Sequence, residues 1–402
     1  MKYDLVFEGG GAKGMVFVGA CEEFFGREHT FGRLLGTSAG AITATLLAAG
    51  YGPAEMRAAL AEKSGDVSVF STFMGPPKAF TGEEIDAGDL MGLLAKVDIP
   101  RMNGMFESIV ERTLVTALAA AESTRSLVAL IERGGWYCAD AFVVWLSQKL
   151  DSPYPSGRSR KFSQLTLSEF YSRTNVDLSL VASDTNDGKL LVLNHRTAPS
   201  CPVVWAVRMS LSIPFLWEEV IWQSNWGQYR GADISGNAIV DGGVLSNFPI
   251  ELFISDELPI TSVMGPKERS AVIGLLIDES LHVPQVSAMN FEDVRAALSE
   301  LRLVQQLKRL VDTMTSARDK MVVAEYEHLV ARLPAEGYGT TEFDMSENRR
   351  ESLVLAGRNA MAAYLDGVKS TTAANSERMS IQSSAADQIA SKILSAHPPT
   401  FN

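Results

Sequence analysis

The first fifty residues contain the same local pattern twice: a short strand, a glycine-rich turn and a helix. In the first copy, residues 3–7 are strand-like, residues 9–14 hold four glycines and residues 15–25 are apolar over a helical length. The second copy starts with a very short strand at 33–35 and passes through another glycine turn into a helix that ends near Gly50. This alternation of strands and helices indicates an α/β fold.

The middle of the chain adds a hairpin and a strand with an acidic end. Residues 178–183 and 190–194 are strand-like, and the Asn-Asp-Gly sequence at 186–188 tolerates the positive φ of a tight turn. These features predict a β-hairpin. A further strand at 239–240 ends at Asp241, so we expect this carboxylate at a strand end.

The later part of the chain is mainly helical. Apolar residues recur with helical spacing over 294–314 and 353–365. After residue 366 the sequence becomes rich in Ser, Thr, Ala and Asn. We therefore predict one domain over residues 1–366 and a polar tail over 367–402, in which 385–394 can form a short helix.

Charge and hydropathy exclude several classes of protein. Lys and Arg number 36 and Asp and Glu number 48 in 402 residues, giving a net charge of −12. Nucleic-acid binding needs a basic surface, so we expect no nucleic-acid partner. No apolar run approaches the ~18 residues of a membrane span, and the best run, 271–277, suits a buried strand.

The start of the chain and its cysteines bear on the compartment. An acid at position 4 and glycines from position 9 leave no room for the apolar region of a signal peptide. Cys21, Cys138 and Cys201 lie far apart, which argues against a disulfide framework and against a structural zinc site. We expect a cytoplasmic protein.

A candidate nucleophile lies in the second glycine turn. The segment from Gly36 to Gly40 fits the pattern Gly-x-Ser-x-Gly, in which small flanking residues permit a tight strand-to-helix turn that exposes the serine hydroxyl. Ser38 at its centre is therefore a candidate nucleophile. A serine that precedes a helix is also a good N-cap, and the pattern alone leaves both roles open.

The first glycine turn can bind negative charge. Gly9, Gly10, Gly11 and Gly14 follow a strand and lead into a helix, so several backbone N–H groups can converge as an oxyanion hole or an anion cradle. The spacing also fits the dinucleotide fingerprint, although the second strand does not end in the acid that would hold a ribose. A P-loop is excluded because Met15 follows Gly14.

A candidate base follows the strand at 239–240. Asp241 is followed by Gly242 and Gly243, which have no side chains to block access to the carboxylate. Asp241 can act as a general base, and an aspartate that merely starts a turn is the alternative.

In this order, the glycine turn, the Gly-x-Ser-x-Gly segment and the Asp-Gly-Gly segment resemble the motifs of the patatin-like phospholipases. Residues 134–150, the hairpin at 178–193, the segment 206–214 and the Asn-Phe-Pro sequence at 247–249 are also similar to that family. The resemblance extends over most of residues 1–366. One departure is Met209, which stands where a small residue is frequent.

The resemblance implies a three-layer α/β/α fold around a central, mostly parallel sheet. It implies a Ser–Asp dyad without histidine and the hydrolysis of acyl esters of lipids. Carried over by position, Ser38 is the nucleophile, Asp241 is the base, and Gly10 and Gly11 donate amides to the oxyanion. Gly9 and Gly14 complete this loop, and Lys13 either adds positive charge near the oxyanion or is an ordinary solvated lysine.

Two alternatives concern the catalytic machinery. A triad of Ser38, Asp241 and His282 has the order found in α/β-hydrolases, but that fold places several strands before its nucleophile. Residues 184–188 are similar to a calcium loop but one residue short, and no closing glutamate follows. We therefore expect calcium-independent catalysis with neither metal nor cofactor.

The expected substrate is a lipid at a membrane surface, which requires peripheral contact with that surface. The candidates for docking are the loop at 70–80 and the aromatic residues Trp217, Trp222 and Trp226, for which an ordinary core position is the alternative. An activating partner or a small signal molecule is conceivable, but nothing in the sequence identifies one. The competing function is a non-catalytic lipid- or nucleotide-binding module that uses the glycine loop as an anion cradle.

Overall fold

The structure is a computed structural model. It describes residues 1–94, 104–267, 270–284 and 325–371, together with 387, 389–391 and 394. The helix predicted at 294–314 lies outside the described residues, and so does most of the predicted tail.

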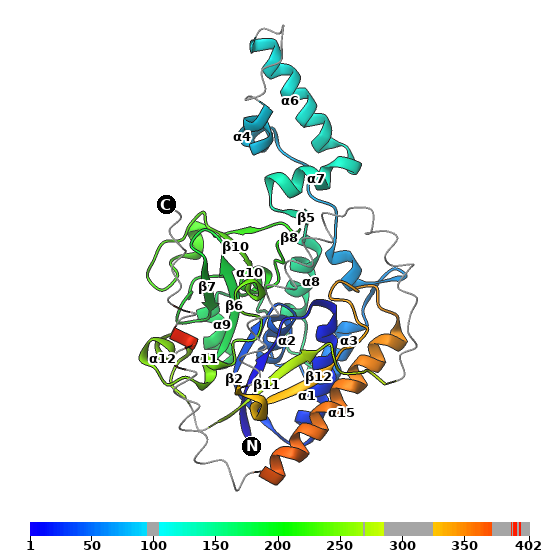
Figure 1. Ribbon diagram of the computed structural model, residues 1–402, viewed down its shortest axis with the longest axis vertical. Helices are drawn as coiled ribbons and strands as arrows, with labels where there is room; N and C mark the ends of the chain where they lie inside the picture. Colours follow the sequence, from blue (N-terminus) through cyan, green and yellow to red (C-terminus); the bar gives the residue numbers. More distant parts are fainter. Residues whose placement is uncertain are drawn as a thin grey trace.

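In the described part of the chain, eight strands form one central sheet (Figure 1). They are β1 (Lys2–Phe7), β2 (Thr30–Thr37), β6 (Leu178–Asp184), β7 (Lys189–Leu193), β9 (Val220–Ile221), β10 (Ala238–Asp241), β11 (Ala271–Asp278) and β12 (Val330–Pro334). The spatial order is β12-β11-β1-β2-β6-β10-β9, and β7 pairs with the second edge of β6. The five strands from β12 to β6 are parallel, whereas β7, β9 and β10 are antiparallel to their neighbours. The prediction of a mostly parallel sheet is confirmed.

Both faces of the sheet are covered, because successive side chains of a strand point to opposite faces. On one face, Leu5 and Phe7 belong to a large apolar core, and on the other face Val6 belongs to a second core. The helices of the first face are α1 (Val16–Gly26), α2 (Ala39–Ala48), α3 (Pro53–Leu60), α8 (Asp140–Asp151), α9 (Leu167–Thr174), α10 (Val203–Ser210) and α15 (Glu347–Thr371). The second face carries α11 (Glu251–Ile254) and α12 (Leu258–Met264). The fold is therefore an α/β/α sandwich, as the sequence predicted.

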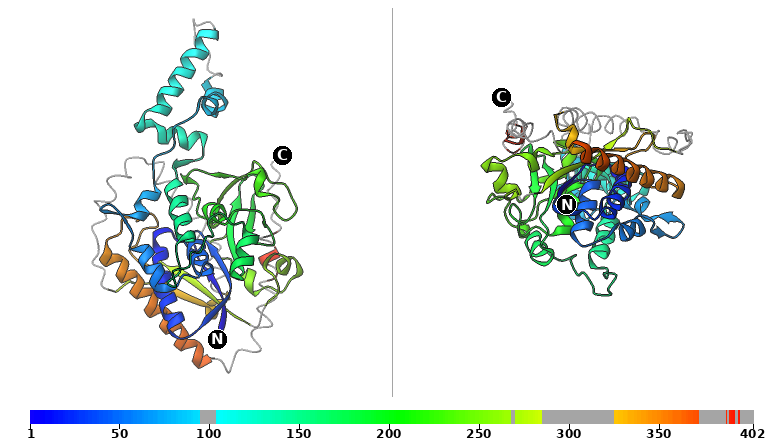
Figure 2. Two further views of the ribbon diagram at one scale, coloured as in Figure 1. Left: turned by 180° about the vertical axis from the view of Figure 1, so that it is seen from behind. Right: turned by 90° about the horizontal axis from the view of Figure 1, so that it is seen from below.

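Several elements differ in length from the prediction. The strand expected at 33–35 is the eight-residue strand β2, because its polar start also pairs with β1. The helix expected at 353–365 is part of α15, which packs along α1 (Figure 2) and continues past residue 366 to Thr371. The hairpin is confirmed as β6 and β7, with Gly188 at φ +62° in its turn.

Part of the predicted tail contacts the body of the protein. Residues 387, 389–391 and 394 are helical, and Ala390 is fully buried in the core on the second face. Ser255 Oγ donates a hydrogen bond of 2.5 Å to Asp387. These residues therefore cover the sheet next to α11.

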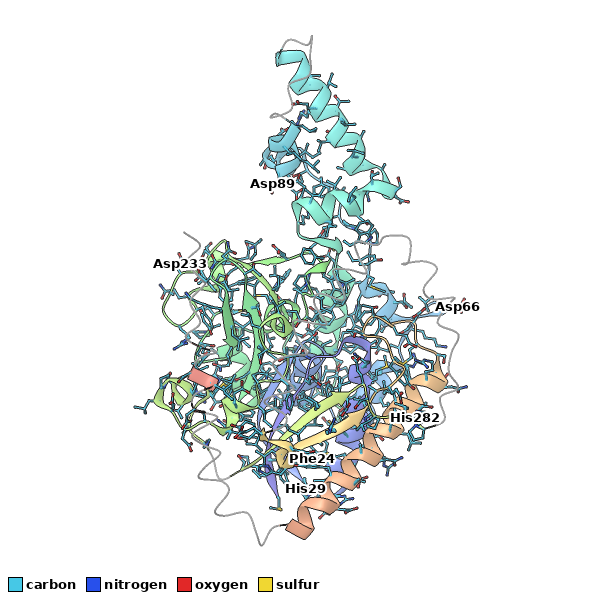
Figure 3. The ribbon with its side chains drawn as sticks, in the orientation of Figure 1. Phe24, His29, Asp66, Asp89, Asp233 and His282 are labelled. Carbon is cyan, nitrogen blue, oxygen red and sulfur yellow. The ribbon has the colours of Figure 1, made fainter. Side chains whose placement is uncertain are left out.

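Helices α4 (Gly82–Ala87), α5 (Asp89–Leu94), α6 (Gly104–Ala120) and α7 (Glu122–Glu132) project from the body as an arm (Figures 1 and 2). The arm has a small core of its own, formed by Ile85, Val115, Ala119 and Val128. Glu132 accepts the backbone N–H groups of Asp89 and Leu90, which ties α7 to the start of α5; Figure 3 labels Asp89.

At the base of the arm, short strands β5 (Gly135–Tyr137) and β8 (Phe215–Trp217) pair in parallel. The Arg133 guanidinium lies 3.9 Å from the centre of the Phe80 ring and forms ion pairs with Glu84 and Glu218. The loop predicted near 70–77 begins with a 3-10 turn over Val69–Phe73, preceded by the small hairpin β3 (Lys63–Ser64) and β4 (Val67–Ser68).

A buried ion pair joins three parallel strands at their amino ends. Asp4 in β1 contacts Arg33 in β2 through its carboxylate at 2.6 Å, and both side chains are almost fully buried. The same carboxylate accepts hydrogen bonds from the Arg33 backbone N–H and from Ser270, which precedes β11. The Arg33 guanidinium also stacks over the ring of Phe253.

We expect Asp4→Ala to destabilise the protein by about 3–5 kcal/mol, because it leaves the buried Arg33 charge without its partner. Denaturant unfolding followed by circular dichroism measures this loss. The matched control is Asp66→Asn at an exposed position labelled in Figure 3, which should change the free energy of unfolding by less than about 0.5 kcal/mol. Equal effects of the two substitutions would contradict the importance of the ion pair.

Candidate active site

The ends of two strands meet on one edge of β6. β7 occupies the other edge of this strand, pairing with residues 180–184. On the shared edge, β2 runs parallel to β6 and ends with Thr37 opposite Val181, while β10 runs antiparallel and ends with Asp241 opposite Ala182. The carboxyl ends of β2 and β10 therefore point toward each other. This register brings Ser38 and Asp241 together although they are far apart in the chain.

Ser38 occupies a strained turn between β2 and α2. Its backbone has φ +51° and ψ −119°, a conformation that side-chain-bearing residues rarely adopt. The turn is tight enough to require glycine on both sides: a Cβ on Gly36 would lie 2.3 Å from the Gly40 carbonyl oxygen, and one on Gly40 would lie 2.3 Å from the Phe7 carbonyl oxygen. The Ser38 hydroxyl makes no capping hydrogen bond to α2. The N-cap interpretation is therefore wrong.

The last residue of α10 and the segment that follows it hold both members of the pair. Ser210 Oγ accepts the backbone N–H of Ser38 at 3.0 Å and donates to the carbonyl of Val181 at 2.6 Å. Two residues later, the carbonyl of Ser212 accepts the backbone N–H of Asp241 at 2.9 Å. One short segment thus fixes the main chain on both sides of the dyad. The sequence analysis recognised 206–214 only as part of the family resemblance and did not identify these contacts.

Arg208 stabilises the segment from Ser210 to Ser212. Its buried guanidinium donates to Ser212 Oγ and to the carbonyl of Glu218. Burial lowers the pKa of Arg208 to about 10, while the nearby Glu218 opposes this shift. The side chain therefore remains charged at neutral pH and acts as an internal brace.

The Asp241 carboxylate is buried and only half satisfied by hydrogen bonds. Oδ1 accepts the backbone N–H of Gly243 at 2.7 Å, in the 3-10 turn η4 (Gly242–Val244). Oδ2 is buried and has no hydrogen-bond partner among the residues that the structure describes. Burial raises the pKa of Asp241 to about 7, although the Ser38 hydroxyl and the Gly243 amide both act to lower it.

The glycine loop lies beside the dyad, between β1 and the 3-10 turn η1 (Gly11–Met15). Gly11 has φ +55°, and a Cβ there would lie 2.1 Å from the carbonyl oxygen of Thr340. A Cβ on Gly9 would meet the side chains of Asn247 and Ser38, and one on Gly14 would lie 2.6 Å from Ala39 Cβ. Glycine at these positions therefore lets the loop approach the start of α2 closely.

The amides of this loop divide into engaged and available groups. The N–H of Gly9 donates to the carbonyl of Asn247 at 3.3 Å, and the N–H of Lys13 donates to that of Gly10 at 3.2 Å. The backbone amides of Gly9 and Lys13 are therefore already engaged within the protein. Within the described ranges, no acceptor takes the N–H of Gly10 or Gly11. These two groups are the available donors.

Lys13 is not an ordinary solvated lysine. Only 5% of its side chain is exposed, and its ammonium group forms an ion pair with Glu279, the residue after β11. Its predicted role as a positive charge near the oxyanion stays a prediction.

Two polar residues that the sequence analysis did not single out anchor the loop. Glu8 Oε2 accepts the N–H of Ile277 at 2.6 Å, which fastens the end of β1 to β11. Asn247 Nδ2 donates to the Gly9 carbonyl at 2.9 Å. The Asn-Phe-Pro sequence was recognised only as part of the family resemblance.

His282 and the loop at 184–188 were the alternatives from the sequence, and both have other contacts in the structure. His282, labelled in Figure 3, is a surface residue with 71% of its side chain exposed, and its Nδ1 lies 3.3 Å from Glu336. Asp184 uses its carboxylate to hold the hairpin turn and Asn237. The described residues contain no group of three or more His, Cys, Asp or Glu side chains that could hold a metal ion.

Five of the predicted docking residues are core residues. Trp217, Trp222 and Trp226 are each at most 6% exposed, and Phe70 and Phe73 pack in the same core. The tryptophan NH groups of Trp217 and Trp222 donate to backbone carbonyls. These five side chains are not available to a membrane, so the core alternative holds for them. The rest of the loop at 70–80 includes exposed residues such as Pro76 and Lys78, and its role in docking stays a prediction.

The pKa of Asp241 predicts how stability changes with pH. A raised pKa means that the folded protein keeps a proton which the unfolded chain loses near pH 4, so this contribution to stability is lost between about pH 4 and pH 7. Asp241→Asn removes the titration. We expect the variant to gain stability relative to the wild type as the pH rises from 5 to 8, by on the order of a few kcal/mol.

Denaturant unfolding at several pH values measures this difference. Asp233→Asn, at an exposed site labelled in Figure 3, is the matched control and should follow the wild type at every pH. A constant difference between Asp241→Asn and the wild type over this range would contradict the raised pKa.

Comparison with known proteins places this site in a family. The sequence model described as patatin-like phospholipase matches residues 5–254. Over 374 residues the chain is 27% identical to the uncharacterized protein YqhO of Bacillus subtilis, covering 91% of this chain and 98% of YqhO. A stretch of 125 residues is 28% identical to a patatin-like phospholipase domain-containing protein of Cryptococcus neoformans, covering 28% of this chain and 14% of that protein.

Two bacterial proteins of solved structure align with most of this chain. VipD from Legionella pneumophila aligns over 91% of this chain and 67% of its own, with 16% identity and a TM-score of 0.47. The type III effector ExoU of Pseudomonas aeruginosa aligns over 91% of this chain and 53% of its own, with 14% identity and a TM-score of 0.39. The family match spans more than half of the sequence, and the chain therefore belongs to the patatin-like phospholipase family.

Proposed function

We propose that this protein is a calcium-independent serine acyl hydrolase that cleaves fatty acyl esters of phospholipids. The observation that carries the proposal is the meeting of β2 and β10, which sets the Ser38 hydroxyl beside a buried carboxylate with a raised pKa. Membership of the patatin-like phospholipase family supports the substrate class.

In the first half-reaction, Ser38 Oγ attacks the ester carbonyl and its proton passes to Asp241. Oδ2 is the carboxylate oxygen for this step, since Oδ1 is already bound to the Gly243 amide. A base with a pKa of about 7 is far better matched to the operating pH than an ordinary aspartate. Because burial raises the pKa of Asp241, this carboxylate can act as the base without a histidine.

The negative charge that develops on the substrate oxygen needs donors that are already in place. The N–H groups of Gly10 and Gly11 meet this condition, because neither is used by another acceptor in the described part of the chain. Each donor of this kind contributes ~10²–10³-fold to turnover. The Ser38 amide is engaged with Ser210, so we assign it a positioning role.

The first half-reaction ends when Asp241 gives the proton that it took from Ser38 to the leaving alcohol and the acyl-enzyme remains. In the second half-reaction, Asp241 takes a proton from the water that attacks the acyl-enzyme and returns it to Ser38 Oγ as the acyl–Ser38 bond breaks. The free fatty acid leaves, and Ser38 recovers its hydroxyl proton. One carboxylate therefore serves both steps, and no metal ion takes part.

A fluorophosphonate probe tests the nucleophile and the base together. The wild type should be labelled on Ser38, and the labelling rate should rise about 10-fold between pH 6 and pH 8 as Asp241 loses its proton. Ser38→Ala should abolish labelling. Asp241→Asn should slow it by ~10²-fold or more and remove its pH dependence.

Asp233→Asn again serves as the control for a change of charge at an exposed aspartate. A folded wild-type protein that resists labelling at every pH would contradict the enzyme proposal and favour the anion-binding module.

The substrate class requires a separate experiment. Mixed phospholipid vesicles incubated with the protein should yield free fatty acid and lysophospholipid by mass spectrometry, at the same rate in calcium and in chelator. Ser38→Ala should leave the lipids unchanged. Products that appear only with calcium would contradict metal-independent catalysis.

A further inference from the structure

The arm formed by α4 to α7 carries a concentration of exposed aliphatic side chains. The exposed fractions are 57% for Ile109, 47% for Val110 and 49% for Leu114 on α6, and 47% for Leu127 and 46% for Ile131 on α7. Each of these side chains costs free energy in water, because apolar surface is more stable when it is buried. The arm has its own core on another side, so these residues are not needed for its packing.

On α6 the exposed side chains form one continuous face. At 100° per residue, Ile109, Val110, Thr113, Leu114 and Ala117 fall within an arc of about 140°, and all five are exposed. The opposite side of the helix buries Glu111, Val115 and Ala119. The outward face is therefore mainly apolar. Glu111, the acidic residue between 109 and 120, lies on the buried side of the helix.

The described side chains of this face, from Ile109 to Ala117, carry no charge. Arg112 flanks it and is neutralised by Asp86 of α4 at 2.5 Å. On α7, Ser123 precedes Leu127 and Ile131 on the same helical stripe. Anionic lipids attract basic side chains, which the stripe on each helix lacks, so an uncharged or zwitterionic surface is its electrostatic match.

The composition favours lipid over protein as the occupant. Protein interfaces are anchored by Trp, Tyr and Arg side chains, whereas the described side chains of this face are Ile, Val, Leu, Thr and Ala. Among the described residues no single helix is long and apolar enough to cross a bilayer. Ile109–Ala120 and Glu122–Glu132 reach that length and hydropathy only when taken together, with a bend of 109° between them.

The position of the arm fits this use. It projects from the body at the end opposite the N-terminus, from which β1 runs toward the glycine loop (Figure 1). The connection between α7 and β5 joins it directly to the α/β body. A projecting apolar element can insert into a lipid surface, which needs no complementary binding pocket.

We infer that the α6–α7 face docks the protein on a zwitterionic lipid surface by inserting Ile109, Val110 and Leu114 below the headgroups. This inference rests on the proposed function, because a lipid hydrolase has to reach a substrate that is held in such a surface. It replaces the tryptophans as the docking site.

The test compares two double variants of the full chain. Ile109→Glu with Leu114→Glu places two charges on the face. Leu258→Glu with Leu355→Glu is the matched control, because these aliphatic side chains are 84% and 45% exposed on α12 and α15, outside the arm. Flotation with phosphatidylcholine vesicles measures binding, and the fluorophosphonate rate and hydrolysis of a soluble short-chain ester measure the dyad without a membrane.

We expect the arm variant to bind phosphatidylcholine vesicles at least ~10-fold more weakly than the wild type, with labelling and soluble-ester hydrolysis unchanged. The control variant should bind like the wild type. Unchanged vesicle binding by the arm variant, or an equal loss in the control, would overturn the inference. So would a wild-type dimer that the arm substitutions convert to a monomer without affecting vesicle binding, since the face would then pair with a second copy.

The two proposals fail separately. Loss of vesicle binding in the arm variant supports the docking surface even when no form of the protein reacts with the probe, a result that would contradict only the hydrolase proposal.

Discussion

The site depends on the way in which two strands of opposite direction share one edge of β6. β2 pairs with residues 178–181 of this edge and β10 pairs with residues 182–184. Both strands end where these two stretches meet. A serine that follows one strand and an aspartate that ends the other are then neighbours without any special side-chain packing. A slip of two residues in either strand would separate them by about 7 Å, so the hydrogen-bond register of the sheet is also the geometry of the dyad.

Around this junction, backbone N–H and carbonyl groups make most of the contacts that position the site. Ser38 and Asp241 are held through their own N–H groups by Ser210 and Ser212, and the glycine loop is held through carbonyls of residues 247 and 340. Such contacts leave the Ser38 hydroxyl and Oδ2 of Asp241 free of structural roles, whereas Oδ1 accepts the Gly243 amide. They also explain why Oδ2 of Asp241 can stay buried and without a partner, which raises its pKa.

Local features were predictable from the sequence and distant contacts were not. The turn around Ser38 and the hairpin after residue 184 depend on glycines and neighbours within a few positions, so their residues show in the sequence. The anchors Ser210 and Thr340 act across long stretches of chain, and a serine or a carbonyl has no distinguishing pattern. The tryptophans were misassigned because an aromatic residue suits both a core and a lipid boundary, and only burial separates the two.

The separation of the dyad in the chain governs when the protein becomes competent. From Ser38 to Asp241 there are 241 − 38 = 203 positions, which a ribosome adds in roughly 10–40 s. The carbonyl of Thr340, which receives the Ala12 amide next to Gly11, is made later still. On the proposed mechanism, a nascent chain therefore holds its serine hydroxyl without base or finished glycine turn, and it can hydrolyse an ester only after residue 340 has been added.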